Sequence, residues 1–293
     1  MFRRCRALLF ASWLFACAAW AAQDPLVLAE PVAADFQTLL ANQGETPVVY
    51  AYLGRRTITV IDFPTLIEQG RMFNRMVALI ERIGAPRERV LSNEELSQFI
   101  RAVGKTAATL AYGNDFLVSE LVVFFNLAEL GNIELNAEEL GLRQLLLAQR
   151  LMESRNGFYQ ALLPSAVILS LPQEKPASPA SPPVTALARQ TILAHEISHA
   201  EYYTNRSYTD FCRQFWRSTM RENERAAFKK FLAKGGYNPE NEEMMINETQ
   251  AYLMHTPDTR AFSPVLVGLA EPVVQVLRQK FRSGFPDMTY PSR

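Results

Sequence analysis

The sequence predicts an α+β fold that is predominantly helical and contains a small sheet. Long stretches carry apolar residues at helical spacing and open with capping sequences, while three short apolar runs have the length and boundaries of strands. The chain has 293 residues, 48% of them hydrophobic, which is enough to bury a sizeable core. Its 30 basic residues balance 30 acidic ones, so a nucleic-acid partner is not expected.

The N-terminal half is expected to begin with a hairpin and to continue as helices. Apolar runs on either side of Gly54 predict two strands, at residues 48–53 and 57–61. Ser92 and Asn136 each stand three residues before a glutamate, which is the pattern of a capping box at a helix start. The stretch that contains Glu120 is too short and too charged for a membrane span, which favours a buried helix. The expected helices cover residues 63–83, 92–113, 116–127 and 136–154.

The C-terminal half is expected to hold one strand followed by helices. Residues 166–171 form a short apolar run between two prolines, which predicts a strand. The polar, proline-rich stretch at residues 172–183 predicts a mobile loop that serves as a lid, a linker or a plain connector. Long helices are expected at residues 208–234, 238–256 and 264–281, the last of them kinked at Pro272.

The first 22 residues have the pattern of a secretory signal peptide. Arg3, Arg4 and Arg6 precede a 14-residue apolar stretch, and small residues at positions 19 and 21 provide a cleavage site. The stretch is shorter than the ~20 apolar residues that a membrane span needs. An alternative is a lipoprotein signal that ends before Cys17, whose lipidation would anchor the protein to a membrane. We therefore expect an exported protein, either periplasmic or associated with the cell envelope.

Two regions are expected after the signal peptide: a mostly helical N-terminal region at residues 23–163 and a second region at residues 164–293. One continuous core is the default arrangement, and a separate N-terminal domain or an inhibitory pro-segment is the alternative. After removal of the leader, Cys212 is the one cysteine expected to remain, so the fold does not depend on an internal disulfide.

The chemistry of the chain is concentrated in the motif His195-Glu196-Ile197-Ser198-His199. Histidines four residues apart project from one face of a helix, so both imidazoles can bind a single metal ion. Glu196 lies about 100° around the helix from His195, where its carboxylate can take a proton from a water molecule. The whole chain has three histidines, so this spacing is not expected by chance. The motif predicts a Zn²⁺ site with its own general base.

A third protein ligand is required, and Glu248 is the first candidate. In the helix expected at residues 238–256, Glu248 falls among apolar side chains, where a carboxylate without a partner would be costly to bury. Alternatively, Ile246 and Leu253 mark the buried face and Glu248 is solvated. His255, two turns further along the helix, is the competing candidate for third ligand.

The motif and the later sequence Asn247-Glu248-Thr249-Gln250-Ala251 resemble those of the gluzincins, the branch of zincin metallopeptidases that includes thermolysin-like enzymes. The resemblance extends over residues 191–256 and implies a zincin-like scaffold in the C-terminal region. It also implies that His195, His199 and Glu248 bind zinc and that Glu196 activates water.

Two features depart from the gluzincin pattern. Tyr252 stands where many members have an aspartate, and 48 residues separate His199 from Glu248. The resemblance further implies that the strand at residues 166–171 is an edge strand that binds the substrate backbone, with a fully buried strand as the alternative. His255 and Tyr252 are candidates to donate a hydrogen bond to the oxyanion of the reaction. The helix dipole also favours a histidine at the helix end, which is the other explanation for His255.

We therefore expect an exported, zinc-dependent metalloprotease, an endopeptidase that acts on protein or peptide substrates. One alternative is a zinc-stabilised envelope protein that serves in binding or scaffolding without catalysis. Another is a hydrolase that cleaves the peptide crosslinks of peptidoglycan. The sequence does not specify the oligomeric state.

Overall fold

The computed structural model describes residues 24–285 and confirms an α+β fold that is mainly helical. The expected signal peptide at residues 1–22, with Cys17, lies outside the described residues. Within residues 24–285, no helix combines the length and the apolar composition needed to cross a membrane. The elements in chain order are β1 (Val32–Ala34), α1 (Phe36–Ala41), β2 (Val48–Tyr52), β3 (Ile58–Phe63), α2 (Leu66–Ile80), α3 (Asn93–Ala102), β4 (Asn114–Leu117), α4 (Val118–Leu130), α5 (Ala137–Ala148), β5 (Met152–Arg155), β6 (Phe158–Ala161), β7 (Val167–Pro172), α6 (Ala186–Thr204), α7 (Arg206–Gln214), the π-helical segment η1 (Phe215–Thr219), α8 (Glu222–Lys234), α9 (Glu242–His255), α10 (Pro264–Val267) and α11 (Glu271–Gly284).

The main sheet has five strands in the order β1-β2-β3-β7-β4. β1 is parallel to β2 and β3 is parallel to β7, whereas the β2–β3 and β7–β4 pairs are antiparallel. The β2–β3 pair confirms the predicted hairpin. β7 confirms the strand expected at residues 166–171, but it lies between β3 and β4, so its expected role as a substrate-binding edge strand is wrong. Its residues are all buried, as suits an apolar strand covered on both faces.

The edge of the sheet next to β7 is formed by β4, a strand that the sequence did not predict. Asn114 and Phe116 are buried while Asp115 and Leu117 are partly exposed, which is the alternation of a strand. The Asn114 amide donates a 2.7 Å hydrogen bond to the Ser170 hydroxyl of β7. The helix expected at residues 116–127 begins only at Val118. The short strand was missed because it runs directly into the apolar sequence of α4.

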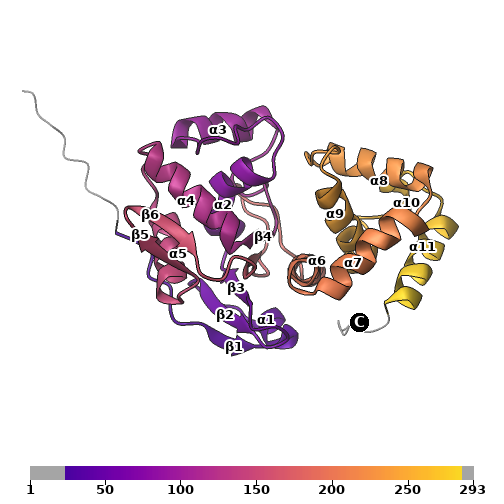
Figure 1. Ribbon diagram of the computed structural model, residues 1–293, viewed down its shortest axis with the longest axis horizontal. Helices are drawn as coiled ribbons and strands as arrows, with labels where there is room; N and C mark the ends of the chain where they lie inside the picture. Colours follow the sequence, from indigo (N-terminus) through magenta and orange to yellow (C-terminus); the bar gives the residue numbers. More distant parts are fainter. Residues whose placement is uncertain (1–23, 286–293) are drawn as a thin grey trace, which may run out of the picture.

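Helices cover both faces of the main sheet. One face packs against α2, α4 and α5 in an apolar cluster that includes Phe63 and Phe73. The other face packs against α1 and α6 in a cluster that includes Leu169 and Ile197. The C-terminal helices α7–α11 form a second body with an apolar cluster of their own, and Figure 1 shows α6 between this body and the sheet.

Two helices of the N-terminal half end earlier than expected. The capping boxes at Ser92 and Asn136 are both present, but α3 ends at Ala102 and α5 at Ala148. After α5 the chain forms the β5–β6 hairpin, whose turn contains Asn156 and Gly157 with φ of 53° and 81°. Positive φ at both central positions is the signature of a tight hairpin turn, which Asn-Gly favours.

The C-terminal helices are divided differently from the prediction. The helix expected at residues 208–234 is interrupted and consists of α7, η1 and α8. The helix expected at residues 264–281 is two helices, because Gly268 ends α10 in the left-handed conformation and Pro272 lies in the first turn of α11. The proline-rich segment is a loop whose two isolated bridges, Lys175–Val184 and Ser178–Ser181, make it a narrow hairpin.

The motif helix α6 is fastened to the sheet by a buried ion pair between Arg189 and Asp62 of β3. The guanidinium donates to the two carboxylate oxygens at 2.9 and 2.8 Å, and it also donates to the carbonyl oxygens of Pro172 at 2.7 Å and Leu40 at 3.1 Å. Both side chains are almost completely buried, at 3% and 0% exposure. In a bidentate arrangement with these additional hydrogen bonds, the attraction between the charges can offset the desolvation cost of burying them.

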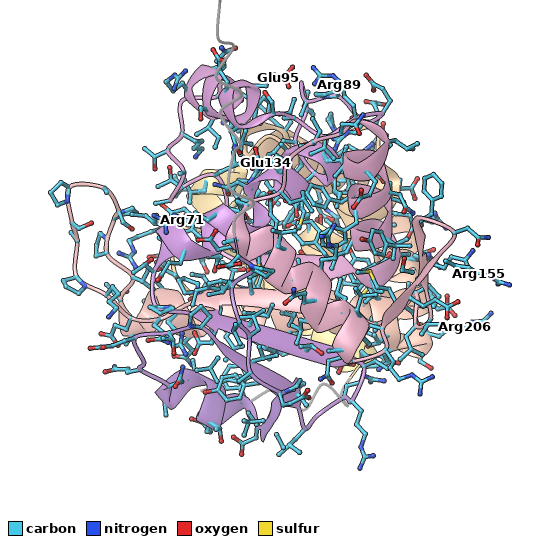
Figure 2. The ribbon with its side chains drawn as sticks, turned by 90° about the vertical axis from the view of Figure 1, so that its left-hand side faces the viewer. Arg71, Arg89, Glu95, Glu134, Arg155 and Arg206 are labelled. Atoms are coloured by element: carbon cyan, nitrogen blue, oxygen red, sulfur yellow. The ribbon has the colours of Figure 1, made fainter. Side chains whose placement is uncertain are left out.

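We expect Arg189→Ala to lower the free energy of unfolding by about 3–5 kcal/mol, because it leaves the Asp62 carboxylate buried without a counter-charge. Arg89→Ala is the control. Arg89 pairs with Glu95 at the surface, where Figure 2 shows both side chains at the periphery, and solvent screening should make the effect of its loss on the free energy of unfolding far smaller. Urea unfolding monitored by circular dichroism measures both values. Equal losses in the two variants would contradict the role given to the buried pair.

Candidate metal centre

The motif lies in the middle of α6, a helix that is enclosed on both sides. Its N-cap is Thr185, whose hydroxyl accepts a 3.2 Å hydrogen bond from the Ala188 amide. The sheet covers one side of α6 and α9 packs against another, so Ile197, Ser198 and His199 are all buried although they point in different directions. Polar side chains in such a helix need partners from other elements.

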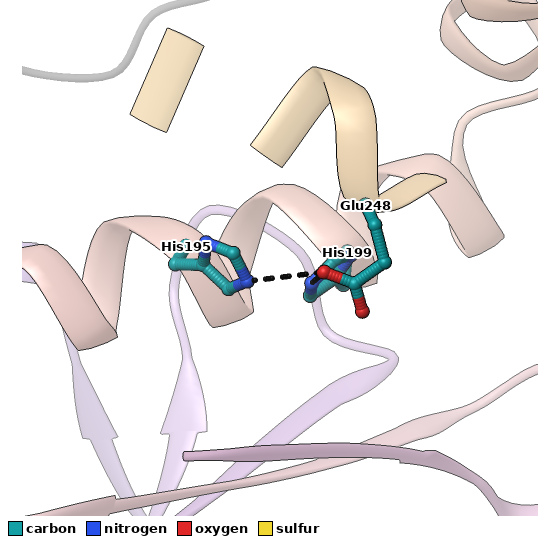
Figure 3. Close-up of side chains that lie close together, drawn as sticks. All are labelled: His195, His199 and Glu248. Atoms are coloured by element: carbon teal, nitrogen blue, oxygen red, sulfur yellow. Dashed lines mark ion pairs between the residues drawn. The ribbon is translucent and has the colours of Figure 1, made fainter. Parts of the chain in front are cut away.

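Three predicted ligands meet at this point. Nε2 of His195 lies 3.6 Å from Oε2 of Glu248, and Nε2 of His199 lies 3.8 Å from the same oxygen. Figure 3 shows the two imidazoles of α6 facing the carboxylate of α9, and the ligand atoms of all three residues lie within 4.8 Å of one another. Two ligand atoms of a tetrahedral zinc ion are about 3.3–3.4 Å apart, since each bond is ~2.0–2.1 Å long. The separations therefore suit a common divalent cation.

The Glu248 carboxylate supplies an independent indication of a missing cation. The residue is 8% exposed, and within residues 24–285 its Oε2 atom has no hydrogen-bond partner. A buried carboxylate oxygen without a partner is costly, and neutral imidazoles that present lone pairs cannot donate to it. A metal ion would satisfy Glu248, His195 and His199 together. Glu248 is buried, as predicted, and the alternative of a solvated Glu248 is not observed.

Residues at the rear of each imidazole fix its orientation and tautomer. The Thr256 hydroxyl donates to the Ala251 carbonyl at 3.0 Å, so it accepts a hydrogen from Nδ1 of His195 at 2.9 Å. Oδ1 of Asn247 accepts a hydrogen from Nδ1 of His199 at 2.9 Å. Both rings are therefore protonated at Nδ1 and present the Nε2 lone pair to the site. Such outer partners are typical of histidine ligands to metals.

Burial also keeps the imidazoles neutral. It lowers the pKa of His195 to about 4 and the pKa of His199 to about 4, so both rings are uncharged near neutral pH. A neutral imidazole is the form that binds a metal. Burial raises the pKa of Glu248, and His199, Arg82 and a hydrogen bond with Tyr237 oppose that rise.

Glu196 lies in the angle between α6 and the edge strand β4. It is buried, and a Cβ atom at Gly113, just before β4, would overlap its carboxylate, so the close approach requires glycine there. Asp115 of β4 forms a second group with Glu196 and His199, whose ligand atoms lie within 4.8 Å of one another. Burial raises the pKa of Glu196 well above its usual range, and the charges of Glu248 and Glu81 add to the shift. Sequence reasoning did not find Asp115, because nothing local distinguishes it.

His255 and Tyr252 take different positions around the ligands. His255 is buried and belongs to neither group of clustered ligand atoms, so the geometry favours Glu248 over His255 as third ligand. Burial, followed by the nearby His195 and His199, lowers the pKa of His255 to about 3. The Tyr252 ring packs edge-on against His195 at a centroid distance of 4.8 Å, and burial raises the pKa of its hydroxyl.

A pocket of 340 Å³ has Glu248 in its wall and is lined by both halves of the molecule. Glu81 and Asp115 line it from the N-terminal half, and Tyr203, Tyr237 and Glu248 line it from the C-terminal half. The proline-rich loop expected at the mouth of the site is not among the lining segments of residues 24–285. Glu248 is the one of the three candidate ligands among the lining residues of the described chain, so the pocket lies beside the candidate metal centre.

No family model matches the chain, and searches of curated proteins and of solved structures return no match.

We expect Thr256→Val to weaken zinc binding by about 10–100-fold, because it removes the acceptor that orients His195 while preserving the shape of the side chain. Thr249→Val, within α9, is the matched control: Thr249 is buried and its hydroxyl has no hydrogen-bond partner among the described residues, so zinc affinity should stay unchanged. Competition against a chromogenic chelator measures both affinities. Glu248→Ala, which removes the third ligand itself, should give a larger loss than Thr256→Val. Equal affinity in all variants would rule out this centre.

We expect Glu81→Gln to stabilise the metal-free protein at high pH. Burial, with further repulsion from Glu248 and Glu120, raises the pKa of Glu81 from 4.5 to about 7. A raised pKa in the folded state contributes stability below pH 4.5 that is lost as the pH rises through 7. The variant should therefore match the wild type at pH 4.5 and exceed it by about 2–3 kcal/mol at pH 8. Urea unfolding in the presence of EDTA tests this, and a difference that is independent of pH would contradict it.

Proposed function

We propose that the protein is a zinc-dependent metalloprotease, and specifically an endopeptidase. His195, His199 and Glu248 would hold the zinc ion, and Glu196 would act as general base. The observation that carries the proposal is the convergence of three metal-binding side chains from α6 and α9, one of which, Glu248, lines a pocket, with the carboxylate of Glu196 buried nearby. The predicted leader at residues 1–22 supports export, in the periplasm or at the envelope.

The residues present suit hydrolysis of a peptide bond. Bound zinc would supply a Lewis acid that polarises the carbonyl and makes water acidic near neutral pH. Glu196 would accept the proton of the attacking water and return it to the leaving amine. Burial raises the pKa of Glu196 above its usual range, a shift in the direction that favours return of the proton to the leaving amine.

The edge strand β4 could bind the substrate backbone, and two tyrosines could stabilise the oxyanion. β4 pairs with β7 on one side, and an extended peptide can add to the other side of an edge strand through backbone hydrogen bonds. This would bring a scissile carbonyl past Asp115 and Glu196. Tyr252, which packs on His195, and its neighbour Tyr237 are the candidates to donate a hydrogen bond to the oxyanion.

We expect Glu196→Gln to lower kcat for peptide hydrolysis by at least ~10²–10⁴-fold while it retains about one zinc ion per chain. Glu201→Gln is the matched control on the same helix, because Glu201 pairs with Arg55 away from the ligands and its loss should leave hydrolysis intact. Cleavage of a quenched-fluorescent peptide mixture and of purified peptidoglycan, together with elemental analysis, measures both properties. Undiminished cleavage by Glu196→Gln would refute the mechanism, and zinc binding without any cleavage by the wild type would favour a zinc-stabilised binding protein.

A further inference from the structure

The pocket beside the metal centre is lined by an excess of acidic side chains. Glu81 reaches it from the end of α2, Asp115 from β4 and Glu120 from the first turn of α4. Among the described residues that line the pocket, Arg213 is the one cation. Its guanidinium is held by Glu243 through hydrogen bonds of 2.9, 3.0 and 3.1 Å, so Arg213 leaves the other carboxylates uncompensated.

The other nearby cation, Arg82, is also engaged. Its guanidinium donates to the carbonyl oxygens of Gly235 at 2.5 Å and Leu110 at 2.7 Å, and it lies over the ring of Tyr237 at 5.4 Å from the centroid. It thereby bridges the two halves of the molecule at the edge of the pocket. Arg82 reduces the local negative charge but forms no ion pair with Glu81 in the described part of the chain.

Glu81 and Glu120 are not arranged to chelate a small ion. The groups of clustered ligand atoms among residues 24–285 are His195-His199-Glu248 and Asp115-Glu196-His199, and neither Glu81 nor Glu120 belongs to them. Calcium or magnesium would need several oxygens within bonding distance of one point. Carboxylates spread around a 340 Å³ pocket instead suit a larger, organic cation, because pockets of about 300–1,000 Å³ hold organic ligands.

One observation shows that an acidic group is retained in the pocket at a cost. Glu81 is the C-cap of α2, where the helix dipole disfavours a negative charge, and its carboxylate makes no hydrogen bond or ion pair with the described residues. Glu248, which also lines the pocket, is assigned to the metal and is not counted here. Unpaired acidic groups in a cleft are characteristic of sites that bind a ligand.

The pocket is also lined by aromatic side chains. Tyr202, Tyr203 and Tyr237 line it together with the carboxylates. Aromatic faces attract ammonium and guanidinium groups, and the stacking of Arg82 on Tyr237 is an instance within this pocket wall. An acidic, aromatic pocket next to Glu248 is therefore complementary to a basic side chain close to the bond that is cleaved.

We propose that this pocket binds the lysine or arginine side chain of a peptide substrate and that Glu81 is a specificity-determining residue for it. The proposal rests on the proposed peptidase function and names its substrate class. Asp115 and Glu120 would contribute to the same negative field, while Asp115 also lies beside Glu196 and is unsuited to a clean test.

The test uses the full-length, zinc-loaded protein and blocked hexapeptide mixtures that are degenerate except for one central residue, either lysine or its uncharged counterpart norleucine. We expect kcat/KM to be at least ~10-fold higher for the lysine mixture. Glu81→Gln should reduce this ratio by about 3–10-fold. Glu94→Gln, which removes one charge from the exposed face of α3, should leave the ratio unchanged.

A binding measurement separates this inference from the proposed function. Fluorescence anisotropy of the same labelled mixtures with Glu196→Gln, alone and combined with Glu81→Gln, reports recognition without cleavage, and spermidine is added as a competitor. A preference for lysine that Glu81→Gln diminishes supports the inference even if the wild type cleaves nothing. Cleavage of both mixtures at equal rates overturns the inference and leaves the peptidase function standing. Displacement by spermidine without any preference between the mixtures also overturns it, in favour of a free polyamine.

Discussion

The helix α6 is buried between the sheet and α9, and this burial governs the chemistry of the molecule. The charged side chains near the two ends of α6 are paired with residues of other elements. Near its start Arg189 is neutralised by Asp62, and near its end Glu201 accepts from Arg55 at 3.0 and 2.7 Å. Between these two pairs, the local hydrogen bonds leave two imidazole lone pairs and one carboxylate oxygen facing one another. A divalent cation is the partner that this donor set lacks.

The features that could be predicted from the sequence are those encoded by local spacing. Ser92 and Asn136 with their glutamates define helix starts through hydrogen bonds within one turn, and the predicted capping boxes are present. The two histidines of the motif share a face because the helix repeat requires it. Glu248, although 48 residues away in sequence, was identified because a carboxylate on an apolar stripe calls for a buried partner.

The features that could not be predicted depend on contacts between distant segments. Asp115 belongs to a four-residue strand that leads straight into an apolar helix, so neither its strand nor its approach to Glu196 has a local signal. Thr256 acts only because the end of α9 lies behind His195. The same limit applies to Glu81, whose position at the end of α2 gives no indication of the pocket that it faces. In general, functional sites of proteins retain arrangements that cost stability.

The strand order makes the candidate metal centre dependent on both halves of the chain. All three candidate ligands and Glu196 lie in the C-terminal half of the chain, yet the described residues of that half contribute β7 alone to the main sheet. A fragment comprising residues 164–293 would leave β7 without either neighbour and would separate Arg189 from Asp62. The C-terminal half is therefore not expected to fold and to hold the candidate centre without the N-terminal half. The candidate ligands and most strands of the sheet that supports them come from different halves of one polypeptide.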